Sequence, residues 1–61
     1  MSVGEYISII EKEFNDGKRF IELSSSDPMK LRKRIYEACR RRGLLWTFAT
    51  SDKSIFVIAT L

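Results

Sequence analysis

Apolar side chains recur at spacings of four, three and four along the first fifteen residues, as they do on one side of a helix. This stripe consists of Val3, Ile7, Ile10 and Phe14. Ser2 and Glu5 have the S-x-x-E spacing of a capping box, in which each side chain bonds the backbone amide of the other residue. Gly17 can adopt the left-handed conformation that ends a helix. The pattern therefore predicts a helix over residues 3–15.

A second helical pattern occupies residues 27–43 and has its own start and stop signals. Asp27 precedes a proline, and a residue in that position favours the extended conformation that an N-cap needs. Pro28 loses no hydrogen bond at the first helical position, and Gly43 is suited to end the helix. The stripe that we expect to be buried is narrow and consists of Leu31, Ile35, Ala38 and Cys39.

Three shorter segments have the composition of strands. Residues 18–24 mix apolar and charged side chains, which favours an edge strand. Residues 44–50 and 54–60 are rich in β-branched and aromatic side chains, and the Ser-Asp-Lys sequence between them is typical of a turn, so they predict a hairpin. No charge interrupts residues 55–61, as in a central strand that is buried on both faces.

The predicted element order is α-β-α-β-β, an α+β fold. The last strand is the most apolar, so we place it in the middle of a three-stranded sheet, antiparallel to both neighbours. The two outer strands then run parallel to each other, and both helices cover one face. We expect residues 1–61 to form one small domain, which is marginally stable unless a partner chain or another aid stabilises it.

Composition argues against catalysis and metal binding. The chain has no histidine and one cysteine, so it can form no internal disulfide and lacks the usual zinc ligands. Its three glycines are far apart and make no phosphate-binding loop. We therefore expect no enzymatic activity, no cofactor and no metal, and we expect Cys39 to be a buried, unreactive core residue.

The sequence also predicts an intracellular, cytoplasmic protein that does not enter a membrane. No segment approaches the roughly 20 apolar residues of a membrane span. The first residues include Glu5 and no lysine or arginine, unlike a signal peptide. A single thiol fits a reducing compartment.

Charge divides the chain into an acidic and a basic part. Residues 1–27 carry a net charge of −3, and residues 28–61 carry +6. Most basic residues fall on the second predicted helix, and our candidate nucleic-acid-binding residues are Lys30, Lys33, Arg34, Arg40 and Arg41. A cationic helix attracts phosphates, and arginine suits bidentate contacts with them. The alternative is a solvated helix face, whose last-turn arginines stabilise the helix dipole.

The uncovered sheet face is a second candidate surface. A sheet with apolar residues on both faces and helices on one of them leaves an apolar patch, and such patches often bind a partner. We expect this surface to bind a second copy or another protein, through Leu45, Thr47, Ile55 and Val57.

Aromatic and acidic residues offer further alternatives. Trp46 and Phe48 could form a stacking platform for unpaired bases, although core packing is the commoner role. Tyr36 could stack beside the arginines or pack at the sheet margin. The acidic first helix could attract a protein partner. We expect it instead to form ion pairs with the basic second helix.

Two functions remain open. The first is a small basic protein that binds DNA or RNA through its second helix, as a homodimer. The alternative is a protein-interaction module, such as a small inhibitor or adaptor of the kind that viruses encode, which docks on a host protein through the exposed sheet face or its charged helices.

Overall fold

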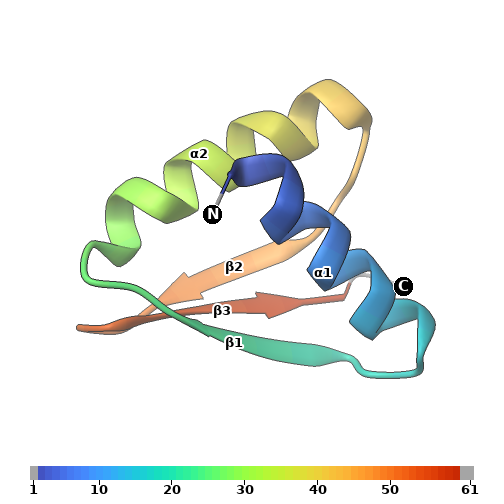
Figure 1. Cartoon of the computed structure of the whole chain (residues 1–61), viewed down its shortest axis with the longest axis horizontal. Helices are drawn as coiled ribbons and strands as arrows, with labels where there is room; N and C mark the ends of the chain where they lie inside the picture. The colour runs from blue at the N-terminus through green and yellow to red at the C-terminus, as the bar shows by residue number, and fades with distance from the viewer. Residues whose placement is uncertain (1, 60–61) are drawn as a thin grey trace.

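Two helices lie across one face of a three-stranded antiparallel sheet in the computed structural model of the chain, which describes residues 2–59 (Figure 1). The elements in order are α1 (Val3–Asn15), β1 (Phe20–Ser24), α2 (Pro28–Arg42), β2 (Thr47–Thr50) and β3 (Ser54–Ile58). The strand order is β1-β3-β2, and β3 is antiparallel to both neighbours. The predicted element order and the central position of the last strand are confirmed.

The start of α1 is the predicted capping box. The Ser2 hydroxyl accepts a hydrogen bond from the Glu5 amide at 3.3 Å, and the Ser2 amide donates to Glu5 Oε1 at 3.1 Å. These two bonds satisfy amides that the first helical turn leaves without partners. The bond from the Ser2 backbone also lowers the pKa of the Glu5 carboxyl below its ordinary value. The helix spans residues 3–15, as predicted.

Both ends of α2 are set by the residues that the sequence indicated. Asp27 caps the start, with its Oδ1 accepting from the Lys30 amide at 3.3 Å. At the other end Gly43 is left-handed, with φ at 73°. The Gly43 amide donates to the Arg40 carbonyl at 3.3 Å, and the Leu44 amide donates to the Cys39 carbonyl at 2.9 Å. This pair of bonds is a Schellman motif, which turns the chain sharply back toward the sheet.

The strands are shorter than predicted. The strand expected over residues 44–50 begins at Thr47, because the Leu44 amide is used in the Schellman motif and not in the sheet. The strand expected over residues 18–24 begins at Phe20. The last strand ends at Ile58, and Thr60, where we expected it to end, lies outside the described residues.

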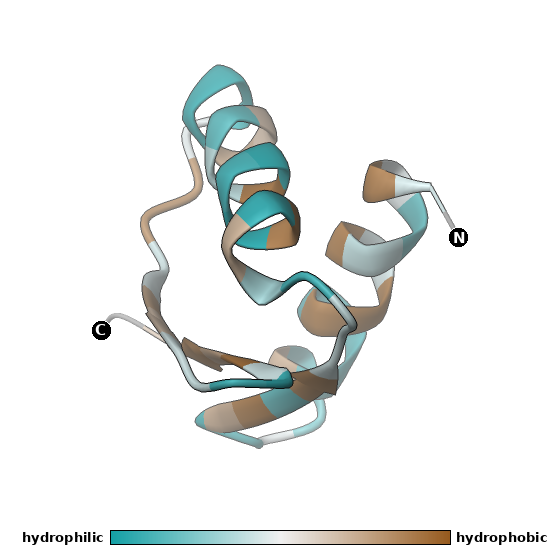
Figure 2. Cartoon of the chain, turned by 90° about the vertical axis from the view of Figure 1, so that its left-hand side faces the viewer, coloured by the Kyte–Doolittle hydropathy of each residue, from teal (hydrophilic) through white to brown (hydrophobic). Residues whose placement is uncertain are grey.

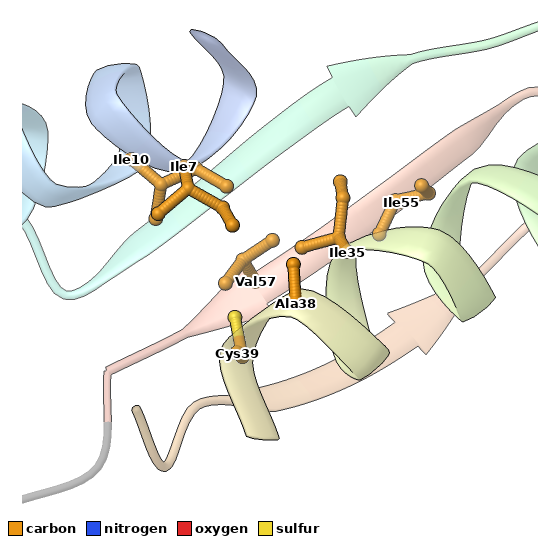
Figure 3. Close-up of a cluster of buried hydrophobic side chains, with 7 residues drawn as sticks. All are labelled: Ile7, Ile10, Ile35, Ala38, Cys39, Ile55 and Val57. Atoms are coloured by element: carbon orange, nitrogen blue, oxygen red, sulfur yellow. The ribbon is translucent and has the colours of Figure 1, made fainter. Parts of the chain in front are cut away.

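The core lies between the helices and the central strand (Figure 3). Its fully or almost fully buried residues are Ile7, Ile10, Ile35, Ala38, Cys39, Ile55 and Val57. The two β3 residues among them, Ile55 and Val57, are 0% exposed because both helices lie over them. Ile21 of β1 and Phe48 of β2 stand directly opposite Val57, so they point to the same face.

The opposite face of the sheet has no helix over it (Figure 1). We define the open sheet face as the outward residues of the three strands, which are Phe20, Glu22, Ser24, Thr47, Ala49, Ser54, Phe56 and Ile58. The prediction placed Ile55 and Val57 on this face and was wrong, because both are buried beneath the helices. Side chains alternate along a strand, and Thr47 pairs with Ile58 while Phe48 pairs with Val57, so Thr47 and Val57 lie on opposite faces.

Gly4 in the first turn of α1 and Gly43 after the last turn of α2 predict opposite effects of alanine. Gly43→Ala should lower the free energy of unfolding by about 1 kcal/mol, because an L-residue is strained in the left-handed region. Gly4→Ala should raise it by about 0.5 kcal/mol through helix propensity. A Cβ at Gly4 meets only ordinary contacts, the nearest at 3.9 Å from Arg42 Nη2. Urea unfolding measures both values. A Gly43→Ala variant as stable as wild type would contradict the assigned motif.

Candidate nucleic-acid interface

Five cationic side chains project into solvent from α2. We define the basic face of α2 as Lys30, Lys33, Arg34, Arg40 and Arg41, all of which are exposed. Successive members are three, one, six and one positions apart, which keeps them on one side of a helix with 3.6 residues per turn. The hydrophilic colouring along most of α2 in Figure 2 reflects these residues. The burial of Ile35 and Cys39 on the inner side fixes which way this face points.

The cations of the basic face have no carboxylate partner within 4.0 Å among residues 2–59. Within residues 2–59 the structure has one ion pair, between Lys18 Nζ and Glu13 Oε2 at 2.7 Å. The ion pairs that we expected between the acidic and basic helices are therefore absent from the described residues, and that prediction was wrong. Glu5 is engaged with Ser2, and Glu13 with Lys18, at the two ends of α1. The positive charge of α2 is not neutralised by α1 and remains available to anions from solution.

Arg42 differs from the other last-turn arginines. Its Nη2 lies 3.9 Å from the position of a Cβ at Gly4, so its side chain extends along the first turn of α1. No atom of Arg40 or Arg41 lies within 4 Å of that position. All three also stabilise the C-terminal end of the helix dipole, by about 0.3–1 kcal/mol each. The dipole accounts for cations in the last turn, but it does not account for Lys30, Lys33 and Arg34.

The aromatic residues considered as a stacking platform do not form one. Phe48 points toward the helices, where its ring lies 6.2 Å from that of Tyr36 in an edge-to-face contact. Trp46 makes an edge-to-face contact with Phe14 of α1 at 5.5 Å. Both residues are partly buried and pack against the core, which is the commoner role that the sequence analysis favoured over the platform. Tyr36 packs at the sheet margin as the alternative had it, yet 43% of its surface remains exposed.

A pocket of about 430 Å³ lies at the C-terminal end of α2. Its lining residues are Tyr36, Arg40, Gly43, Leu44, Leu45, Trp46 and Thr47. Leu45 and Thr47 were predicted to bind a partner through the sheet face. Both are exposed, with Leu45 at 79%, and both border this pocket. The pocket was not predicted, because it depends on the Schellman motif bringing residues 43–47 back beside α2.

The open sheet face carries a feature that the sequence reasoning missed. Phe20 and Phe56 stand on adjacent strands, and their rings stack at 5.5 Å with an interplanar angle of 17°. Phe20 is 55% exposed. Beside them, the Ser54 hydroxyl donates a hydrogen bond to Glu22 Oε2 at 2.8 Å. The sequence signal that could have indicated this stack was the unbroken apolar run in β3, which provides apolar side chains to both faces of the sheet.

Cys39 is 1% exposed and belongs to the core. Burial raises the pKa of its thiol above the ordinary value.

No group of three or more His, Cys, Asp or Glu side chains that could hold a metal ion comes together within residues 2–59. None of the helices in the described part of the chain has the length and apolar content needed to cross a bilayer.

Comparison of the chain with protein-family models, with curated proteins and with solved structures finds no match in any of the three. We therefore infer function from the charges and geometry of the chain itself.

Burial of Cys39 predicts a slow reaction with thiol reagents. The thiolate is the reactive form, and the raised pKa lowers the fraction of thiol that is ionised. Burial of the side chain also keeps the reagent away from the sulfur. Native protein should react with a chromogenic disulfide reagent far more slowly than free cysteine at the same pH, and should react fully once urea unfolds it. Equal rates in native buffer would show that the thiol is accessible, and would contradict the burial of this side of α2 in the core.

Proposed function

We propose that this protein binds nucleic acid through the basic face of α2. The observation that carries the proposal is the set of exposed cations along one side of a single helix, without a carboxylate partner in residues 2–59. A cationic surface of this kind gains affinity by displacing the counterions of phosphates. Within residues 2–59 none of its five members forms an ion pair with a carboxylate of α1, and none is required by the core, which is apolar.

The length of the basic face fits several phosphates of one strand. From Lys30 to Arg41 the helix rises about 16 Å, at about 1.5 Å per residue. One strand of a duplex presents a phosphate about every 3.4 Å along its axis, so about five phosphates fall within that length. Glu37 lies between the two groups of cations and is exposed, so phosphates would contact the two ends of the face rather than its middle. Contacts of this kind give affinity with little sequence preference.

The double variant Lys33→Ala/Arg41→Ala tests this proposal. Both side chains are exposed on the outer side of α2, so their removal should spare the fold. Binding to a single-stranded oligonucleotide should weaken, and the slope of log K against log salt should fall by about 1.4, because each lost phosphate contact removes about 0.7. Fluorescence anisotropy of a labelled oligonucleotide over a range of salt concentrations measures both quantities.

A matched control removes two cations from outside α2. Arg19→Ala/Lys53→Ala lowers the net charge of +3 by the same two units, and both residues are exposed. It should bind with nearly the wild-type salt slope. Equal losses in the two double variants would mean that net charge, and not the basic face, drives binding. Wild-type protein that binds no nucleic acid at low salt would contradict the proposal altogether.

The open sheet face supports a second candidate function, a protein-interaction module whose simplest partner is a second copy. Phe20 is 55% exposed and stacks on Phe56, and Ile58 on the same face is 39% exposed. Large apolar side chains gathered on one uncovered face favour association, and a two-fold dimer would bury the same face of both copies. A small inhibitor or adaptor would use the same surface against a different protein.

A charge at Phe20, on the edge strand β1 of the open sheet face, tests the second candidate. Phe20→Glu should convert a dimer into a monomer, because two carboxylates would be buried in a two-fold contact. Ile9→Glu places the same charge on an exposed apolar residue of α1, away from the sheet, and should leave the dimer intact. Sedimentation velocity gives the oligomeric state. A wild-type chain that is monomeric at high concentration would rule out self-association.

A further inference from the structure

We propose that the pocket at the C-terminal end of α2 receives one unpaired nucleobase of a single strand whose phosphates lie along the basic face. This inference rests on the proposed nucleic-acid binding and adds to it the kind of strand that is bound. The pocket joins the basic face through Arg40, which belongs to both. A strand that follows the basic face therefore reaches the pocket without leaving the surface of α2.

The shape of the pocket follows from the way α2 ends. The Schellman motif sends Leu44 inward, where it packs against the core, and leaves Leu45 exposed at the pocket margin. The chain then runs through Trp46 into β2, so residues 43–47 line the pocket together with Tyr36 and Arg40 of α2. The volume of about 430 Å³ lies within the size range of small-molecule sites, about 300–1,000 Å³.

Each of the two aromatic residues of the pocket packs against a second ring. Tyr36 makes an edge-to-face contact with Phe48, and Trp46 makes one with Phe14. Rings fixed in this way lose little conformational freedom when a ligand stacks on them. Base–aromatic stacking contributes about 1–3 kcal/mol per base and tolerates any base, because every base has a π face. The pocket therefore fits an unpaired base without strong preference for its identity.

The charge of the pocket lining agrees with this ligand. Among the lining residues Arg40 is the charged one, and no carboxylate is present to repel a phosphate. The hollow beside the N-terminal end of α2 is different. It has Lys30 and Arg34, but Asp27 also lines it. Paired bases inside a duplex are stacked and cannot enter a pocket unless they are flipped out, which costs a few kcal/mol. A pocket that uses one unpaired base therefore favours single strands over duplexes.

Fluorescence of Trp46, the chain's only tryptophan, tests the inference directly. The protein is titrated at low salt with a short oligothymidylate and with a strand of equal length whose nucleotides are abasic. The oligothymidylate should quench Trp46 with saturation and bind about tenfold more tightly than the abasic strand, as the lower part of the stacking range gives. A duplex of the same length should quench Trp46 less than the single strand.

The titration separates failure of the pocket from failure of the proposed function. Equal affinities for the thymidylate and abasic strands, with no change in Trp46 fluorescence, would overturn the pocket and leave phosphate binding by α2 intact. Absence of binding to both strands at low salt would overturn the two together.

Substitutions at Tyr36 give a second readout that does not depend on Trp46. Tyr36→Leu keeps an apolar side chain but removes the ring, and should bring oligothymidylate affinity down toward that of the abasic strand. Tyr36→Phe keeps the ring and should retain the tighter binding. Circular dichroism confirms that both variants fold. Phe20→Leu makes the same change on the open sheet face, and a loss of affinity there with none in Tyr36→Leu would place the base on the sheet and overturn the pocket.

Discussion

The central strand β3 can bury Ile55 and Val57 only if both helices lie across the same face of the sheet. These two side chains have no exposed surface, and they meet Ile35 from α2 and the isoleucines of α1 (Figure 3). Each buried aliphatic side chain of this size contributes about 1.5–3 kcal/mol relative to an exposed one. A chain of 61 residues has few such side chains, so the orientation of α2 follows from this contact.

The same contact decides which residues of α2 face outward. Because Ile35 and Cys39 are turned toward β3, the lysines and arginines of the basic face are held on the far side, in solvent. The Schellman motif at Gly43 then brings the chain back beside the helix and makes the pocket. The proposed phosphate binding thus depends on the buried apolar stripe and the row of cations, and the proposed base-binding pocket depends in addition on the left-handed glycine.

The helices and the topology were predictable because local signals act over a few residues. Ser2, Asp27 and Gly43 specified helix ends through hydrogen bonds that the structure contains. The apolar run of β3 indicated its central position correctly. Contacts between elements were harder to predict from the sequence. Both faces of β3 are apolar, so the sequence did not say that Val57 pairs with Phe48 on the helix side, and the open sheet face was assigned to the wrong residues.

Side-chain interactions across the helical layer were also beyond sequence reasoning. Charges of opposite sign on α1 and α2 favoured ion pairs between them, but local partners hold Glu5 and Glu13 at the ends of α1 instead.

The most direct test of nucleic-acid binding by α2 and the adjoining pocket is an NMR titration with a single-stranded oligonucleotide. We expect amide shift changes concentrated in α2 and residues 43–47. Changes confined to β1 and β3, or none at low salt, would contradict the proposed binding.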